Sequence, residues 1–343
     1  MTLLDVRDLA VAFPTDGGLA RAVDGVSFQV DRGEAVGLVG ESGCGKTVTA
    51  LAVMGLLPPS AMVGEGSRIR FRDQELTTAS DEARRQVRAT GMAMVFQDPM
   101  TSLNPVLRVG EQVVEPLRRH RGLSRRQARA RGLDLLREVG IADAERCFDQ
   151  YPHQLSGGMC QRAMIAMAVS CEPALLIADE PTTALDVTVQ AQVLALLAEL
   201  RARRNMGLLL VTHDLGVVAQ VCDRVVVMYA GQVVESGPVE AIFRRPRHPY
   251  TRGLLGSLPR LDDRRGRLRP IRGSVPPATD WPGACRFRPR CDYAWERCAA
   301  HMPGLLPPAS GGAGAGPVHR ARCWLVDEPV RDQPPSPGDE ATP

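Results

Sequence analysis

Hydrophobic and polar positions alternate near the N-terminus and run together further along the chain. LLDVRDLAVAF (3–13) and AVDGVSFQV (22–30) place apolar side chains on one face, with the turn-forming PTDGG between them. This pattern is typical of strands with one buried face. Shorter, mostly apolar runs predict four further strands, at 35–40, 91–97, 174–179 and 207–212.

Helical periodicity occupies the stretches between these strands. It is found at 47–57, throughout the arginine-rich region 108–170, and at 187–204. The run RVVVMYAGQVVESG (224–237) predicts a hairpin that turns at Ala230–Gly231. Strands that alternate with helices indicate an α/β domain with a mainly parallel sheet.

The composition changes near residue 244, where proline, arginine and glycine become frequent. This change predicts a main domain at 1–243, with a helical subdomain at about 98–170, and a C-terminal extension at 244–343. Two low-complexity segments, 307–317 and 333–343, predict a linker and a tail.

Charge and hydropathy exclude several classes of protein. The net charge of +3 is too small for a general nucleic-acid binder. No apolar run is long enough to span a bilayer, and the first residues lack the pattern of a signal peptide. Five cysteines scattered over the first 222 residues are typical of a reduced cytosolic protein. The arginine-rich segment 117–132 fits either a surface near anionic lipid headgroups or a solvated helical face.

Residues 40–47, GESGCGKT, fit the phosphate-binding pattern G-x-x-x-x-G-K-[ST]. Its glycines let backbone N–H groups turn inward around a phosphate, and the following helix adds its dipole. A chance glycine-rich turn would lack the apolar strand before it and the helix after it. The predicted nucleotide-binding residues are Gly40, Glu41, Ser42, Gly43, Cys44, Gly45, Lys46 and Thr47, and Thr47 is also expected to hold Mg²⁺ through its hydroxyl.

Lys46 is the only lysine among the 42 lysine and arginine residues of the chain. A compact ammonium on a flexible stem can reach between the β- and γ-phosphates, whereas the planar fork of arginine is too broad. The single lysine therefore indicates a position that arginine cannot fill. Cys44, inside the loop, has two interpretations: a small side chain in a serine-sized place, which we prefer, and a redox-sensitive thiol.

A second candidate site follows the predicted strand at 174–179, which ends on two adjacent carboxylates. Ligands of open α/β sheets bind at the carboxyl ends of the strands. We expect Asp179 to lie on the Mg²⁺ side, through water, and Glu180 to act as general base for the water that attacks the γ-phosphate. The alternative, that two acids at a strand end only cap a helix, leaves their place after a phosphate loop unexplained.

The segment LSGGMCQR (155–162) opens a further helix, and Ser156, Gly157 and Gly158 at its start predict a second anion site. With two phosphate-binding devices, the chain resembles an ATP-binding-cassette (ABC) ATPase. In that family the serine-glycine-glycine signature of one subunit closes over ATP held by the phosphate loop of the other. The resemblance implies a P-loop NTPase fold of the RecA type, with an antiparallel β subdomain, a helical signature subdomain and here a small cysteine-containing lobe.

The remaining family motifs follow in order over residues 3 to about 240. The resemblance implies that Phe13 stacks on adenine, that Gln97 in VFQDP serves the glutamine loop near the metal, and that His213 contacts the γ-phosphate. Asp186, at the end of TTALD, would link two active sites. Gln97, Glu180 and His213 are therefore the predicted catalytic residues, with ATP and Mg²⁺ as cofactors.

A narrower resemblance covers nearly the whole chain. FQDPMTSLNP, HPYTRGLLGSLP and GACRFRPRCDYAWERC are similar to segments in ATPase subunits of bacterial dipeptide, oligopeptide and nickel importers, most of all the D-type subunit. This implies ATP-driven uptake of peptides, with nickel or another small solute as alternatives. The implied partners are a second ABC ATPase, in a heterodimer or a homodimer, two transmembrane permeases and, indirectly, a solute-binding protein. We expect no nucleic acid partner, and a peripheral position on the cytoplasmic face of the cell membrane.

Two other classes of function fit less well. ABC ATPases of DNA repair and translation usually carry paired cassettes or long coiled-coil insertions, and this chain has one cassette and neither insertion. A binding module with an inactive site would not need Lys46, Glu180 and His213.

The last four cysteines have the spacing C-x5-C-x6-C-x24-C, at Cys285, Cys291, Cys298 and Cys323. The surrounding proline- and glycine-rich sequence cannot build much core, so a small lobe here needs an internal link. Four thiolates suit a [4Fe–4S] cluster, which we expect, or zinc, although the short C-x2-C spacing of zinc sites is absent. Tails of similar peptide-transporter ATPases are implicated in cluster binding. Four free thiols remain the third interpretation.

Overall fold

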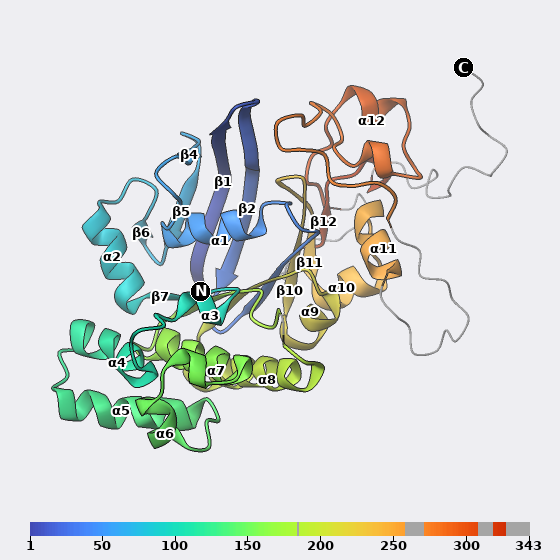
Figure 1. The fold of residues 1–343 in the computed structure, drawn as a ribbon. Coiled ribbons are helices and arrows are strands. Elements are labelled where there is room, and N and C mark those ends of the chain that lie inside the picture. The colour runs from blue at the N-terminus through green and yellow to red at the C-terminus, as the bar shows by residue number, and fades with distance from the viewer. Residues whose placement is uncertain (184, 258–270, 308–317, 327–343) are drawn as a thin grey trace.

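The computed structural model describes residues 1–183, 185–257, 271–307 and 318–326, and within these ranges the chain forms two β-sheets (Figure 1). The prediction of an α/β fold is confirmed. Most of the predicted linker and the whole predicted tail (308–317 and 333–343) lie outside the described residues. None of the described helices has the length and apolar character needed to cross a membrane.

The central sheet has seven strands in the order β12-β11-β10-β3-β9-β8-β7. The strands from β10 to β7 are parallel to one another, and the hairpin β10–β11 adds an antiparallel edge. Strands β3, β8 and β9 are buried along their whole length, as their apolar runs predicted. The bounds are β3 (Ala35–Val39), β7 (Met92–Val95), β8 (Leu175–Asp179), β9 (Gly207–Thr212), β10 (Arg224–Tyr229), β11 (Gln232–Pro238) and β12 (Arg320–Ala321).

The hairpin turns where the sequence predicted. Ala230 and Gly231 both have positive φ, 44° and 77°, which is the geometry of the tight turns that follow the twist of two paired strands.

The second sheet is antiparallel and is built around the two long N-terminal strands (Figure 1). Helix α1 (Lys46–Met54) contacts strands of both sheets, and a buried apolar cluster surrounds it. The apolar side chains of the alternating pattern in the first thirty residues therefore face this core. The strands are β1 (Thr2–Thr15), β2 (Gly18–Asp31), β4 (Met62–Val63), β5 (Arg68–Phe71) and β6 (Gln74–Glu75).

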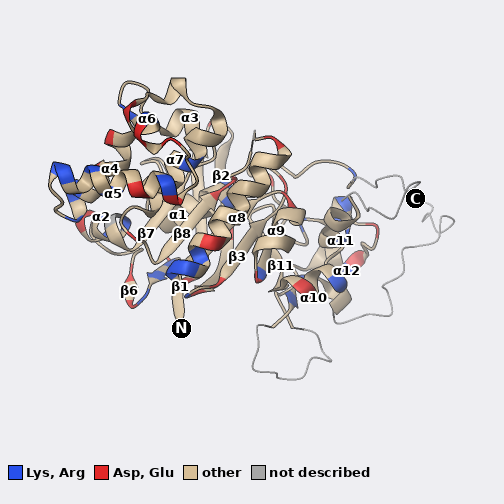
Figure 2. Ribbon diagram, turned by 90° about the horizontal axis from the view of Figure 1, so that it is seen from below, with Lys and Arg blue, Asp and Glu red and all other residues tan. Residues whose placement is uncertain are grey.

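Helix α2 packs near α1 through Val87, whereas most of the remaining helices cover the other face of the central sheet and extend into a helical unit (Figure 1). In that unit α4 and α6 pack so closely that a Cβ on Gly110 would lie 2.2 Å from the ring of Phe148. Glycine at this position permits the contact. The arginines at the junction of α4 and α5 are exposed (Figure 2). The bounds are α2 (Asp81–Thr90), α3 (Pro99–Ser102), α4 (Val109–His120), α5 (Arg125–Glu138), α6 (Ala144–Asp149), η1 (Pro152–Gln154), α7 (Gly157–Val169), α8 (Val187–Arg204), α9 (Leu215–Val221) and α10 (Val239–Arg244).

The C-terminal residues form a small lobe next to the hairpin (Figure 1), which we call the C-terminal lobe and define as the described residues from 249 onward. Phe287 ties it to the sheet, with its ring centroid 5.2 Å from that of Tyr229 and 5.5 Å from that of Tyr250. Strand β12 extends the central sheet by pairing with β11. The other elements of the lobe are α11 (Pro249–Gly256), η2 (Arg288–Arg290), α12 (Glu296–Ala300) and η3 (Trp324–Val326).

Candidate active site

A cavity of about 620 Å³ lies at the carboxyl edge of the central sheet. Parallel strands end at one edge, so residues that follow β3, β7, β8 and β9 in sequence meet there although more than a hundred positions separate some of them. The cavity is lined by Ala22, Gly40, Glu41, Ser42, Gly43, Gly45, Lys46, Thr47, Val48, Gln97, Glu180, His213 and Leu254.

The loop between β3 and α1 follows a path that requires glycine. Gly40 and Gly45 have φ of 155° and 99°. A Cβ on Gly40 would lie 2.2 Å from the carbonyl oxygen of Met228, and one on Gly45 would lie 2.3 Å from that of Ala22. Side chains are therefore excluded on steric grounds, and the curled backbone that a phosphate needs is present. Helix α1 begins at Lys46 with no side chain bonded across its N-terminus.

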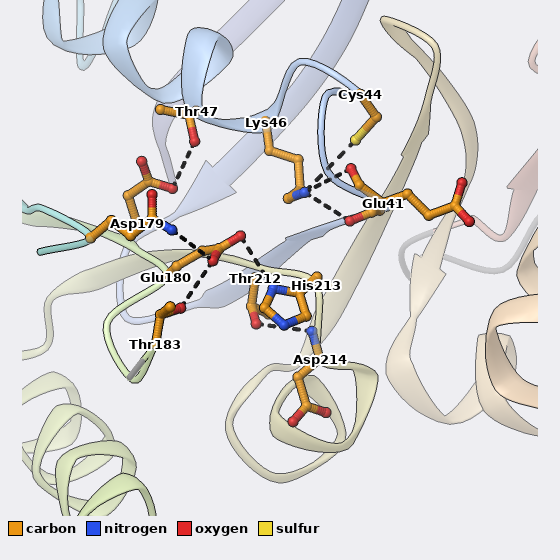
Figure 3. A network of polar contacts seen from close by, with 12 residues as sticks. Glu41, Cys44, Lys46, Thr47, Asp179, Glu180, Thr183, Thr212, His213 and Asp214 are labelled. Atoms are coloured by element: carbon orange, nitrogen blue, oxygen red, sulfur yellow. Dashed lines mark hydrogen bonds and ion pairs between the residues drawn. The ribbon is translucent and has the colours of Figure 1, made fainter. Parts of the chain in front are cut away.

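The Lys46 side chain folds back along this loop and is 5% exposed (Figure 3). Its Nζ donates to the carbonyl oxygens of Gly40, at 2.7 Å, and Glu41, at 3.0 Å. The ammonium is thus held at the wall of the cavity. The neighbouring Cys44 is fully buried, and burial raises the pKa of its thiol. A protonated, enclosed thiol favours the packing interpretation of Cys44 over a redox role.

Two carboxylates at the end of β8 have different surroundings (Figure 3). Asp179 is 3% exposed, burial raises its pKa, and it accepts a hydrogen bond of 3.2 Å from the Thr47 hydroxyl. Glu180 has φ of 44°, an unusual value for a residue with a side chain, and this turns its carboxylate toward the ends of β7 and β9. A hydroxyl and a carboxylate at this spacing are oxygen ligands of the kind that Mg²⁺ prefers.

Three side chains converge on the Glu180 carboxylate. Gln97 Nε2 donates to it at 3.1 Å, Thr183 Oγ1 donates at 2.9 Å, and His213 Nδ1 lies 3.2 Å away. Although burial opposes it, hydrogen bonds with His213 and Thr183 lower the pKa of Glu180. The carboxylate is therefore ionised at neutral pH. The structure thus brings together the three residues that the sequence singled out as catalytic.

Other predicted residues lie outside the lining of this cavity. Ser156 caps α7 by accepting from the Met159 amide at 3.3 Å, and Asp186 caps α8 by accepting from the Val189 amide at 2.9 Å. The two caps are neighbours, since a Cβ on Gly158 would lie 2.8 Å from Val189 Cγ1, and Ser156 and Gly157 are exposed. The predicted adenine-stacking residue, Phe13, packs on β1 against the core around α1.

Comparison with known proteins identifies the family. Residues 23–183 match the ABC transporter family, and residues 234–298 match the oligopeptide/dipeptide transporter C-terminal region. The chain is 48% identical over 97% of its length to an oligopeptide transport ATP-binding protein of Bacillus subtilis, covering 99% of that protein. It is 51% identical over 91% of its length to a dipeptide transport ATP-binding protein of Escherichia coli, covering 95% of it.

The chain belongs to the ABC transporter ATP-binding subunits. Among solved structures it is similar to a dimeric ATP-binding cassette in a post-hydrolysis state with ADP and phosphate, with a TM-score of 0.62, 26% identity, and coverage of 69% of this chain and 99% of that one. The predicted ATPase activity and the predicted family are thereby confirmed. The cofactors that this family implies, ATP and Mg²⁺, fit the glycine loop and the Thr47–Asp179 pair described above.

Sequence reasoning missed part of this ATPase site. Leu254 lines the cavity from α11, and two other residues of the C-terminal lobe bond to Glu41 of the loop. These are Tyr250 and Arg290, which lie 209 and 249 positions from Glu41. Both stand within segments that carried the resemblance to peptide importers, but neither segment contains a signal that it touches the phosphate loop.

The prediction of an iron–sulfur cluster is wrong. Cys285, Cys291, Cys298 and Cys323 do line one small hollow of the C-terminal lobe. However, no group of three or more histidine, cysteine, aspartate or glutamate residues in the described ranges is arranged to hold a metal ion, so the zinc alternative has no support there either. The four thiols are free, and burial raises the pKa of Cys291 and Cys323 to about 12.

Proposed function

We propose that this ABC ATPase powers the import of peptides. The observation that carries the proposal is the cavity lined by Lys46, Thr47, Glu180 and His213, in which Thr47 is bonded to the buried Asp179 and His213 to Glu180. The choice of peptides rests on relatives named for oligopeptide and dipeptide transport that match the chain nearly end to end. Nickel, the alternative solute, has no comparable support.

The residues of the proposed nucleotide site have distinct roles. The amides of the glycine loop and the Lys46 ammonium bind the β- and γ-phosphates. The Thr47 hydroxyl and Asp179 hold Mg²⁺, which neutralises phosphate charge when it is bound, and Gln97 approaches the same ion. Phe13 supplies the stacking surface for adenine.

Glu180 is the proposed general base. Its lowered pKa keeps it ionised, so that it can accept a proton from the attacking water. His213 and Gln97 orient the carboxylate by bonding to its two oxygens, and His213 is exposed enough to reach the γ-phosphate as well.

We propose that the complete transporter contains further protein subunits. We propose that Ser156, Gly157, Gly158 and Asp186 close over ATP held by a second ABC ATPase, since they are grouped away from this chain's own cavity. A heterodimer is our first choice and a homodimer the second. Two permeases and a solute-binding protein complete the transporter, and the subunit lies at the cytoplasmic face of the membrane as a peripheral protein.

We also propose that residues 1–243 form the nucleotide-binding domain, with 98–170 as its helical subdomain, and that 244–343 form an extension. Two different family matches, at 23–183 and 234–298, support a division. Strand β12, which joins the sheet of the main domain, implies that the extension does not move independently.

The test of this function is the Glu180→Gln variant in the assembled transporter. An amide cannot act as a base, so we expect ATP affinity within about twofold of wild type and a loss of turnover of about 100-fold or more. Glu199→Gln, an exposed change on α8, is the matched control and should keep full turnover. Near-normal turnover in Glu180→Gln would refute the assignment.

Uptake of dipeptides and of Ni²⁺, measured separately in cells lacking the subunit, tests the solute.

A further inference from the structure

The phosphate loop is held from outside by two residues of the C-terminal lobe, and both act on Glu41. Arg290 Nη1 and Nη2 donate to the two carboxylate oxygens of Glu41 at 2.6 and 2.9 Å. The Tyr250 hydroxyl accepts a hydrogen bond of 2.8 Å from the Glu41 backbone amide. One residue of the loop is thus fixed at its side chain and at its main chain.

The arginine is itself rigidly placed. Its side chain is 5% exposed, and Nε donates to the carbonyl oxygen of Arg272 at 2.7 Å. The guanidinium lies 5.6 Å from the ring centroid of Tyr229 and 5.9 Å from that of Phe287. A planar fork that meets both oxygens of a carboxylate fixes the direction as well as the position of its partner. The Glu41 side chain therefore has little freedom, although it is 30% exposed.

The tyrosine is equally constrained. Tyr250 is fully buried on α11, and its ring centroid lies 4.8 Å from that of Tyr229. Burial raises the pKa of its hydroxyl, so the group stays neutral and remains available to the Glu41 amide. An amide that bonds to this hydroxyl is held in one orientation, and the residues that follow it in the loop start from a fixed direction.

We propose that Arg290 and Tyr250 are positioning residues for ATP binding, which set the curvature of residues 40–47 before nucleotide arrives. Neither residue lines the cavity, so both act through Glu41. A preformed loop does not lose conformational freedom when phosphate binds, and affinity rises accordingly. The C-terminal lobe is thus a part of the nucleotide site and not only an appendage. This inference rests on the proposed nucleotide-binding role of the loop.

The test compares Arg290→Gln and Tyr250→Phe with wild type, in ATP binding by the purified subunit and in ATPase of the assembled transporter. A hydrogen bond to a charged group contributes enough to change affinity about tenfold. We expect the ATP Kd and KM to rise about tenfold in Arg290→Gln and about threefold in Tyr250→Phe, with kcat within about twofold. Arg288→Gln is the matched control, an exposed arginine in the same short helix, and should bind ATP normally.

A double-mutant cycle separates positioning from simple attachment of the lobe. If Arg290 acts through Glu41, the Glu41→Gln/Arg290→Gln pair should bind ATP no more weakly than the weaker single variant. Multiplied effects in the pair, or normal ATP affinity in Arg290→Gln and Tyr250→Phe, would overturn the proposal. Tyr250→Phe keeps the buried ring, and so carries the test if Arg290→Gln does not fold. Lys46→Ala is measured alongside: unchanged ATP affinity there would refute the nucleotide site itself.

Discussion

Lys46 illustrates what a single side chain is selected to do. Its Nζ reaches two carbonyl oxygens of a loop so tight that three of its positions are glycines with positive φ. A guanidinium would need a wider space and would present its donors in a fixed plane. The sequence marked the position because the other 41 lysine or arginine positions are all arginine, and the geometry supplies the physical reason.

His248 makes stability depend on pH. It is 2% exposed, its Nδ1 accepts a hydrogen bond from the Tyr250 amide, and burial lowers its pKa to about 4. The unfolded chain binds a proton near pH 6.5 and the folded chain does not, so stability falls as the pH drops from about 6.5 toward 4. Between pH 7 and pH 5 this contributes a loss of about 2 kcal/mol.

The variant His248→Asn tests this, because asparagine can still cap α11 but does not titrate. We expect its free energy of unfolding to fall about 2 kcal/mol less than that of wild type between pH 7 and pH 5. All three tryptophans lie in the C-terminal lobe, so urea unfolding followed by tryptophan fluorescence reports on this region. His301→Asn, an exposed histidine, should keep the acid sensitivity of wild type. Equal acid sensitivity in His248→Asn would contradict the prediction.

At the scale of elements, strands that depend on a local sequence pattern could be predicted, and strands that depend on pairing between distant segments could not. Strands β3, β8 and β9 lie within a residue or two of their apolar runs, because a strand buried on both faces has no polar positions to obscure its ends. The edge strand β12 is two residues long and pairs with β11 more than eighty positions earlier. No periodicity encodes such a contact, and the same is true of Arg290 and Glu41.

The same distinction applies to the candidate site, where some neighbours could be predicted from the sequence and others could not. Gln97, Glu180 and His213 could be expected to meet, since each follows a parallel strand of one sheet. The cysteine spacing misled because a spacing gives the number of thiols near one another but not the direction of each. Burial, which decides whether a thiol ionises, is a property of the packed lobe.

The segment Gln97–Asn104 connects the cavity to the helical unit, and its residues have opposite environments. Leu103 is 1% exposed, so a substitution there would test packing. Gln112 pins the end of the segment to α4 by bonding to both the amide and the carbonyl of Asn104, at 2.8 and 3.0 Å. Met100 is 45% exposed on α3, and we expect this apolar side chain to contact a permease.

We predict that Met100→Asp lowers transport at least fivefold while basal ATPase stays within about twofold, because the introduced charge should weaken the expected apolar contact with the permease and leave the cavity intact. Transport and ATPase are measured on the same reconstituted transporter. Met62→Asp is the matched control, a methionine with 56% exposure on β4, and should affect neither activity. Equal losses of transport and ATPase in Met100→Asp would indicate a structural role for the segment.

At the scale of the whole molecule, the two segments proposed to bind phosphate, residues 40–47 and 156–158, do not line the same cavity within one chain. The glycine loop faces the cavity, whereas Ser156 and Asp186 lie at the exposed starts of α7 and α8. In the two-subunit arrangement proposed above, the isolated chain binds nucleotide and a second ATPase completes the hydrolytic site. Binding and turnover should therefore respond to different residues.

We predict that Ser156→Arg leaves the ATP affinity of the isolated subunit within about twofold and lowers turnover of the assembled transporter at least 50-fold, because a large cation at the start of α7 obstructs the approach of the second subunit. Lys46→Ala should lose both. His153→Arg, an exposed change just before α7, is the control and should keep both.

Mixing Lys46→Ala with Ser156→Arg subunits then distinguishes the assemblies: a homodimer regains one intact site and part of its turnover, whereas a heterodimer with a different ATPase regains none. A fall in ATP affinity in isolated Ser156→Arg would mean that the signature serves its own chain's cavity, and the two-subunit site would have to be abandoned.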